Sequence, residues 1–227
     1  MGELVSYASN GGTSQGYLAL PKSGSGPAVI VIQEWWGLVP HIKTLADRFA
    51  DAGFVALAPD LYHGVQTTEP DQAGKLMMGL AMDQAAKDIA GAADYLAARP
   101  EVDGKIGSVG FCMGGSLALW SATLSPRIVA AVGFYPPVPW ERMSPTWANY
   151  DGKIGVIHCC EADGLSGVHP GVQAAARAIA DAGGKAVTYD YPGTQHAFFN
   201  DDRPEVYDAE AAKTSWARTL EVFRTHL

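Results

Sequence analysis

The stretch VGFCMGGSLAL, residues 109–119, decides the fold because it joins a short apolar run to a helix-like segment through a glycine-rich turn. Its pattern, Gly-x-Cys-x-Gly-Gly, is typical of a nucleophile elbow, where a strained residue stands clear of a sheet. Gly110 and Gly114 leave room across such a turn, and Gly115 lets the next helix pack closely. Cys112 occupies the nucleophile position, so we expect a reactive thiol. The alternative is that Cys112 is a small apolar residue filling the turn.

Outward from this turn, short apolar runs alternate with amphipathic segments of helix length. Strands are predicted at 4–7, 16–20, 27–33, 54–60, 105–112, 127–135, 153–160 and 185–191, the first two as a hairpin. The final helix is predicted to bury Ala209, Ala212, Trp216, Leu220 and Phe223. This alternation indicates an α/β fold, a doubly wound parallel sheet with helices on both faces, in a single domain over residues 1–227.

Composition excludes several classes of function. The formal net charge is −8 without any basic run, which argues against a nucleic-acid partner. No apolar run reaches the roughly 20 residues of a membrane span, and the first ten residues lack the pattern of a signal peptide. The three cysteines form no disulfide framework, so we expect a cytoplasmic protein, either a monomer or a small homo-oligomer.

Polar residues follow the predicted strands at their carboxyl ends, where ligands gather in open α/β sheets. Cys112, Asp163 and His196 appear in the chain order nucleophile, acid, histidine, which is the order of the α/β-hydrolases. Glu161 is the alternative acid, and Cys160 is the alternative thiol. Neither Cys160 nor its neighbour Cys159 is followed by glycines and a helix, so both are interpreted as structural.

Two backbone N–H groups are expected to form an oxyanion hole. The N–H of Met113 begins the helix after the elbow, and that of Trp35 follows the first buried strand. Glu34 lies at the end of the same strand, where a carboxylate is costly unless it is partnered, so a structural salt bridge is one explanation. The histidines show no metal-ligand spacing, and we expect neither a metal nor a cofactor.

The motifs QEWWG (33–37), APDLYHG (58–64), GFCMGG (110–115), EADG (161–164) and GTQHAF (193–198) resemble those of the dienelactone hydrolase family. The resemblance covers roughly residues 4 to 225. It implies an α/β-hydrolase fold and a small-molecule ester or enol-lactone substrate. It also implies an acyl-thioester intermediate on Cys112, with His196 and Asp163 completing a triad. Glu34 is then the carboxylate that contacts the resting thiol and moves when substrate binds.

The sequence departs from the family where two arginines bind the substrate carboxylate, because Pro70 and Asn200 occupy those positions. A less charged and more apolar substrate is therefore expected. The candidate pocket residues are Trp36, Met77, Tyr135, Phe198 and Asn200, and a loop rich in proline and tryptophan spans residues 136–150. Two alternative functions remain open: a general esterase or thioesterase with the same triad, and a non-hydrolytic thiol protein for redox sensing or ligand binding.

Overall fold

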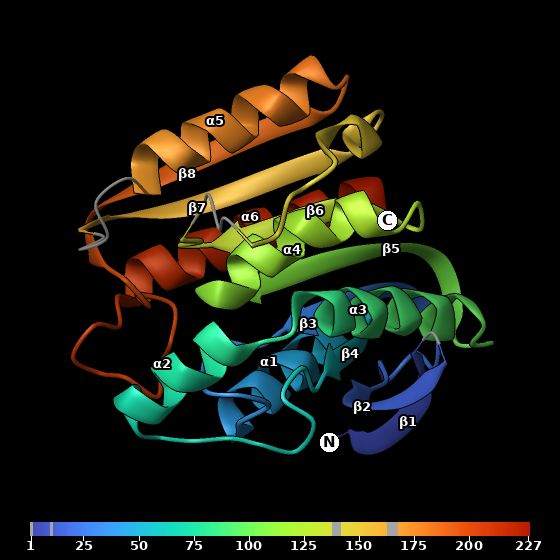
Figure 1. Cartoon of the computed structure of the whole chain (residues 1–227). Helices are drawn as coiled ribbons and strands as arrows, with labels where there is room; N and C mark the ends of the chain where they lie inside the picture. Colours follow the sequence, from blue (N-terminus) through green and yellow to red (C-terminus); the bar gives the residue numbers. More distant parts are fainter. Residues whose placement is uncertain (1, 10, 138–141, 163–167) are drawn as a thin grey trace.

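The strands of the computed structural model, which describes residues 2–9, 11–137, 142–162 and 168–227, form one eight-stranded sheet. Its strand order is β1-β2-β4-β3-β5-β6-β7-β8 (Figure 1). The strands are β1 (Glu3–Ser9), β2 (Gly12–Ala19), β3 (Gly26–Ile32), β4 (Val55–Pro59), β5 (Val102–Phe111), β6 (Ile128–Phe134), β7 (Ile154–Ala162) and β8 (Lys185–Gln195). Each coincides with a predicted strand, although β2 and β5 begin, and β8 ends, several residues beyond the predicted limits.

The sheet is mostly parallel, as expected for a doubly wound fold. β1 and β2 form an antiparallel hairpin, β2 is antiparallel to β4, and the pairs from β4 through β8 are parallel. The parallel strands read as continuous apolar runs because helices cover both of their faces. Their carboxyl ends consequently share one edge of the sheet, where the residues that follow them meet.

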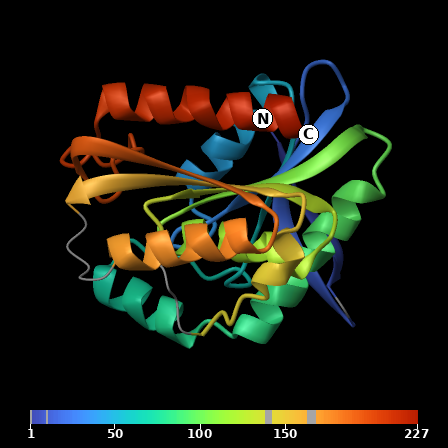
Figure 2. The same cartoon turned by 90° about the horizontal axis from the view of Figure 1, so that it is seen from above.

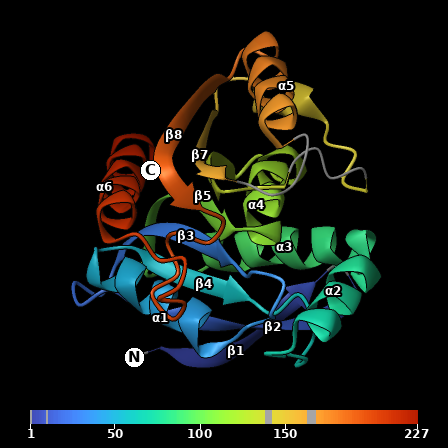
Figure 3. The same ribbon diagram turned by 90° about the vertical axis from the view of Figure 1, so that its left-hand side faces the viewer.

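Helices cover both faces of the sheet (Figures 2 and 3). The helices are α1 (Pro40–Asp51), α2 (Pro70–Gly79), α3 (Met82–Ala97), α4 (Met113–Leu124), α5 (Val168–Asp181) and α6 (Ala209–His226), with a 3₁₀ turn η1 (Trp147–Tyr150). α1 and α6 lie on one face, whereas α3, α4 and α5 lie on the other. None of the described helices combines the length and the apolar character that crossing a membrane requires.

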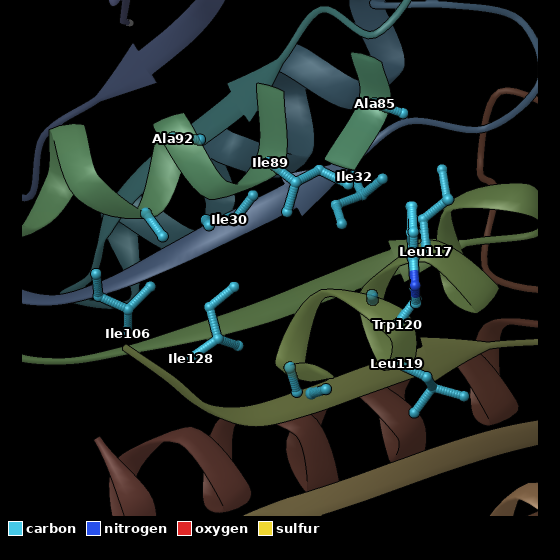
Figure 4. Packing of buried hydrophobic residues seen from close by; sticks show 14 of the residues in the cluster. Ile30, Ile32, Ala85, Ile89, Ala92, Ile106, Leu117, Leu119, Trp120 and Ile128 are labelled. Atoms are coloured by element: carbon cyan, nitrogen blue, oxygen red, sulfur yellow. The ribbon is translucent and has the colours of Figure 1, made fainter. Parts of the chain in front are cut away.

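The core consists of two apolar layers that share the central strands. Successive side chains of a strand point to opposite faces, so β3 contributes to both layers. Ile30 and Ile32 pack with Ile89 of α3 on one face (Figure 4), and Val29 and Val31 lie in the layer of α1 and α6 on the other. Full burial of such a side chain stabilises the fold by about 1.5–3 kcal/mol. These layers fix the sheet edge that carries the candidate site.

The buried face of α6 differs from the predicted stripe at two members, because Ala209 is exposed and Trp216 is only half-buried. Ala209 is exposed because it is the first residue of the helix, whereas Ala211, two positions later, is buried. Ser215 and Thr219 also belong to the buried face. Their hydroxyls donate to the carbonyls of Ala211 and Ser215, at 2.7 and 2.9 Å, which satisfies them inside the helix. The spacing of apolar residues does not predict buried polar residues of this kind.

The described part of the loop 136–150 is anchored at both of its ends. The guanidinium of Arg142 donates to the carbonyl of Leu80, between α2 and α3, at 2.6 Å. The hydroxyl of Tyr150 donates to the carbonyl of Leu119 in α4, also at 2.6 Å. These two hydrogen bonds therefore tie this loop both to the segment between α2 and α3 and to α4.

Candidate active site

Cys112 stands in a strained backbone conformation between β5 and α4. Its φ of 53° and ψ of −124° are rarely adopted by residues other than glycine, and such strain costs of order 1–3 kcal/mol. Two hydrogen bonds hold it there. The N–H of Cys112 donates to the carbonyl of Phe134 at 3.0 Å, and its carbonyl accepts from the N–H of Gly115 at 2.8 Å. The sheet and the helix together impose the conformation of a nucleophile elbow.

The glycines around Cys112 are required by close contacts between backbone segments. A Cβ atom on Gly110 would overlap the carbonyl of Gly114, and one on Gly114 would overlap the carbonyl of Gln33. A Cβ atom on Gly115 would lie 2.7 Å from the carbonyl oxygen of Phe134. All three positions therefore exclude a side chain, which is the steric reason for the Gly-x-Cys-x-Gly-Gly pattern.

The amino end of α4 points at the elbow. Met113 is the first residue of this 12-residue helix, and the first N–H groups of a helix have no partners within it. The positive end of the helix dipole favours a thiolate or a developing oxyanion at this place. Tyr62, which the sequence did not single out, lies in the same neighbourhood and donates its hydroxyl to Sδ of Met113 at 3.4 Å.

Glu34 is a buried carboxyl group with an amide partner. Its side chain is 3% exposed, and Oε2 accepts a hydrogen bond from Nδ2 of Asn200 at 3.1 Å. Burial raises the pKa of Glu34, while His196, Asn200 and Arg203 act in the opposite direction. The Glu34 carboxyl group thus has an uncharged amide as a hydrogen-bond partner, and His196 and Arg203 lie close enough to act on its pKa.

Tyr135 is a common neighbour of the predicted catalytic groups. Its ring centroid lies 4.9 Å from that of His196, which follows β8 and is half-buried. Burial raises the pKa of Tyr135 well above its usual value, and the charges of Glu34 and Cys112 raise it further. The fold therefore gathers Cys112, Glu34 and His196 around one buried tyrosine, from the ends of β5, β3 and β8.

The acid of the predicted triad, Asp163, lies outside the described residues. Its alternative, Glu161, is exposed at the end of β7 and accepts a hydrogen bond from the N–H of Gly193 at 2.6 Å. This contact joins the end of β7 to the loop that precedes His196. Glu161 thus has a backbone partner at the sheet edge, and the assignment of the catalytic acid to Asp163 stays a prediction.

A cleft of about 790 Å³ opens beside Glu34. Segments after β3, after β4 and after β8 form its walls, and Figure 3 shows the loop between β8 and α6 lying beside α1. The lining residues are Glu34, Trp36, Val39, Pro40, His41, Gln66, Thr67, Thr68, Glu69, Gln72, Asn200, Asp202 and Arg203. Most of them belong to exposed loops without apolar periodicity, and only their position after predicted strands could have indicated them.

Two of the predicted pocket residues, Trp36 and Asn200, line this cleft. The other three do not. Phe198 is fully buried and Tyr135 is 1% exposed in the layer of α1 and α6, and Met77 packs against the opposite layer. Tyr135 and Phe198 lie inside the protein and Met77 is half-buried, because apolar side chains near a site more often support its walls than face its ligand. The more apolar pocket expected from the sequence stays a prediction, because the cleft combines apolar residues such as Trp36, Val39 and Pro40 with polar side chains.

The remaining thiols and histidines have structural surroundings. Cys159 and Cys160 are buried in opposite apolar layers, as expected of neighbours on a strand. His158 is fully buried, its ring nitrogens contact the hydroxyls of Tyr191 and Thr219, and burial lowers its pKa to about 3. It is thus a neutral core histidine.

One group of side chains in the described part of the chain has the composition of a metal site. His41, Asp201 and Asp202 bring ligand atoms within 4.8 Å of one another at the rim of the cleft. The same atoms form close contacts, with Nδ1 of His41 at 3.5 and 3.8 Å from the two carboxylates, and Asp201 also faces Arg48. Because burial lowers the pKa of His41, its contacts with the two carboxylates are polar contacts, and Arg48 with Asp201, at 3.8 Å, is the ion pair of this group.

A mostly parallel sheet with a strained residue between the central strand and its helix defines an α/β-hydrolase. Within that class, the chain belongs to the dienelactone hydrolase family, whose sequence model matches residues 14–227. The family consists of carboxylic-ester hydrolases, so this protein is a hydrolase of that kind.

Individual relatives agree with this assignment. The chain is 34% identical to a protein of Aquifex aeolicus assigned as a carboxymethylenebutenolidase, and 35% identical to "Protein usf" of Aquifex pyrophilus, over the whole length of each. It is similar to the crystal structure of a protein from Klebsiella pneumoniae assigned as a dienelactone hydrolase. That similarity has a TM-score of 0.86 and 29% identity, covering 99% of this chain and 98% of that one.

Proposed function

We propose that this protein hydrolyses activated esters or enol-lactones through an acyl-thioester intermediate on Cys112. The strained backbone of Cys112 at the amino end of α4 is the observation that carries this proposal. The thiolate attacks the carbonyl carbon, so that a carbon–sulfur bond forms and the carbonyl oxygen becomes an oxyanion. The N–H groups of Met113 and Trp35 receive that charge, and each such donor lowers the barrier by about 2.7–4 kcal/mol.

His196 moves the protons in both halves of the reaction. It takes the thiol proton as the nucleophile forms and gives it to the leaving alcohol or enol when the carbon–oxygen bond breaks. Water then attacks the thioester and loses a proton to His196. The carbon–sulfur bond breaks, releasing the carboxylic acid and the thiol. Asp163 orients the imidazole throughout, as acids do in comparable triads.

Glu34 links the occupancy of the cleft to the state of the thiol. A charged carboxylate near a thiol disfavours the thiolate through repulsion between like charges. Glu34 both lines the cleft and lies in the neighbourhood that Tyr135 shares with Cys112. A substrate that enters the cleft and displaces this side chain therefore changes the electrostatic field at the sulfur. The thiol stays unreactive until a substrate is bound.

A thiol nucleophile favours esters with good leaving groups. The tetrahedral intermediate expels a thiolate more readily than an alkoxide, so ordinary alkyl esters return to the starting material. An enolate or aryloxide leaves more readily and allows acylation to proceed. The free thiol requires a reducing compartment such as the cytoplasm, where all three cysteines would remain reduced.

The test compares kcat/KM for 4-nitrophenyl acetate, an enol-lactone and ethyl acetate in the wild type and in Cys112→Ala. We expect the variant to lose at least about a thousandfold on the activated substrates. Cys159→Ala is the matched control, since that thiol is buried within β7 and is not part of the elbow, and it should retain activity. Equal turnover by the wild type and Cys112→Ala would remove the thiol from the mechanism. Rapid hydrolysis of ethyl acetate would instead indicate a general esterase.

A further inference from the structure

Five of the residues that line the cleft have uncharged amide or hydroxyl side chains: Gln66, Thr67, Thr68, Gln72 and Asn200. Within this group, Oγ1 of Thr67 donates to Oε1 of Gln72 at 2.8 Å and accepts from the N–H of Glu69 at 3.0 Å. The amide nitrogen of Gln72 has no hydrogen-bond partner among the described residues. Because the bond from Thr67 engages Oε1, the exposed amide nitrogen of Gln72 is available as a donor on the cleft wall, suited to a hydroxyl or carbonyl oxygen of a ligand.

The charged groups of the wall oppose a negatively charged ligand. Three carboxyl groups, those of Glu34, Glu69 and Asp202, face one guanidinium, that of Arg203. Nε of Arg203 already donates to a carboxylate outside the wall, that of Glu205, at 2.9 Å. Burial lowers the pKa of the lining residue His41, which favours its neutral form. A carboxylate entering the cleft would meet more repulsion than attraction.

The size and the aromatic wall of the cleft suit a ring. A volume of about 790 Å³ lies within the range of small-molecule sites, and the indole of Trp36 is half-buried at the wall. Its ring packs edge-on against that of Trp35, with centroids 4.8 Å apart, which fixes its orientation. A flat apolar surface beside amide and hydroxyl groups complements a ring that has both carbon–hydrogen faces and hydroxyl edges.

Resting on the proposed function, we infer that the substrate is an uncharged ester or lactone with a hydroxylated ring, and that the cleft discriminates against carboxylate-bearing rings. Acylated sugars and hydroxylated lactones share this chemistry. Gln72 acts as a specificity residue that binds a ring hydroxyl, whereas Glu69 and Asp202 repel an anion.

The experiment measures competitive inhibition of 4-nitrophenyl acetate hydrolysis by three ring compounds that do not react. Methyl glucopyranoside is uncharged and hydroxylated, methyl glucuronide has the same ring with a carboxylate, and methoxycyclohexane lacks the hydroxyls. We expect the glucoside to have the lowest inhibition constant. The glucuronide should bind about tenfold more weakly, the effect of one unfavourable charge interaction near a protein surface.

Variants of the cleft residues test whether the cleft wall causes the difference between the inhibition constants. Gln72→Leu should weaken inhibition by the glucoside several-fold, and the double variant Glu69→Gln with Asp202→Asn should bring the glucuronide close to the glucoside. Asp71→Asn is the matched control, because this exposed carboxylate lies beside the cleft segment but does not line it. It should leave the ratio of the two inhibition constants unchanged.

Equal or tighter binding of the glucuronide would overturn this inference. So would tighter binding of methoxycyclohexane, or no competition by the glucoside up to its solubility limit. These results are separate from a failure of the proposed function, because that function depends on the loss of turnover in Cys112→Ala, whichever ring compounds bind.

Discussion

A methyl group at position 115 should damage catalysis more than folding. The added Cβ would lie 2.7 Å from the carbonyl oxygen of Phe134, whereas ordinary contacts begin at 3.4 Å, so α4 and β6 must separate by about 0.7 Å. The N–H of Gly115 donates to the carbonyl of Cys112, and this movement is therefore transmitted to the elbow. A misplacement approaching 1 Å costs up to about a hundredfold in rate.

Two further glycine variants calibrate the Gly115→Ala result. Gly74→Ala places its methyl group in open space within α2, so it should keep full activity and gain about 0.5–1 kcal/mol of stability. Gly110→Ala would overlap the carbonyl of Gly114, and it should lose both activity and several degrees of Tm. The assay is kcat/KM for 4-nitrophenyl acetate together with thermal unfolding. We expect kcat/KM to fall about 10- to 100-fold in Gly115→Ala.

Wild-type kcat/KM in both Gly115→Ala and Gly110→Ala would refute the reasoning. That result would mean that the elbow tolerates a shift of α4, and that the close backbone contacts around Cys112 do not position the nucleophile. A loss in Gly115→Ala that exceeds the loss in Gly110→Ala would also contradict the argument, because the overlap at position 110 is the more severe.

Three predictions concern buried polar groups. Burial raises the pKa of Glu34, so the native state holds this proton more tightly than the unfolded chain does. The native state therefore loses stability as the pH rises through that pKa. Glu34→Gln should raise Tm at pH 8, and this gain should vanish in acid. His158 has a pKa lowered to about 3, so its contribution is lost as the pH falls from about 6.5 to about 3, and unfolding of His158→Gln should depend less on pH there. Ser9→Ala removes a hydrogen bond of 2.6 Å to the buried carboxylate of Asp88, and urea unfolding should show a loss of about 1.5–3 kcal/mol. The three arguments would be contradicted by an unchanged Tm at pH 8 in Glu34→Gln, an unchanged pH dependence in His158→Gln and an unchanged urea midpoint in Ser9→Ala, respectively.

The elbow and the sheet could be predicted because steric demands fix their residues locally. Gly110, Gly114 and Gly115 sit where a Cβ atom has no space, and a strand such as β3 is apolar at successive positions because helices cover both faces.

The cleft wall and the long-range polar contacts could not be predicted. Asn200 and Glu34 form a hydrogen bond across 166 positions of the sequence, and Ser9 and Asp88 across 79. Such pairs leave no periodic signal, because the fold alone brings them together. Met77 was placed in the pocket on its type and region, but its packing against the core decides where it points.

The most direct test of the mechanism is to trap the acyl group on the enzyme. The protein is mixed with excess 4-nitrophenyl acetate, quenched in acid within milliseconds and examined by intact mass and peptide mass spectrometry. Our account predicts a burst of 4-nitrophenol and one acetyl group, located on Cys112 and absent from Cys112→Ala. Sustained turnover with no acyl group on Cys112, or with the acyl group on another residue, would contradict it.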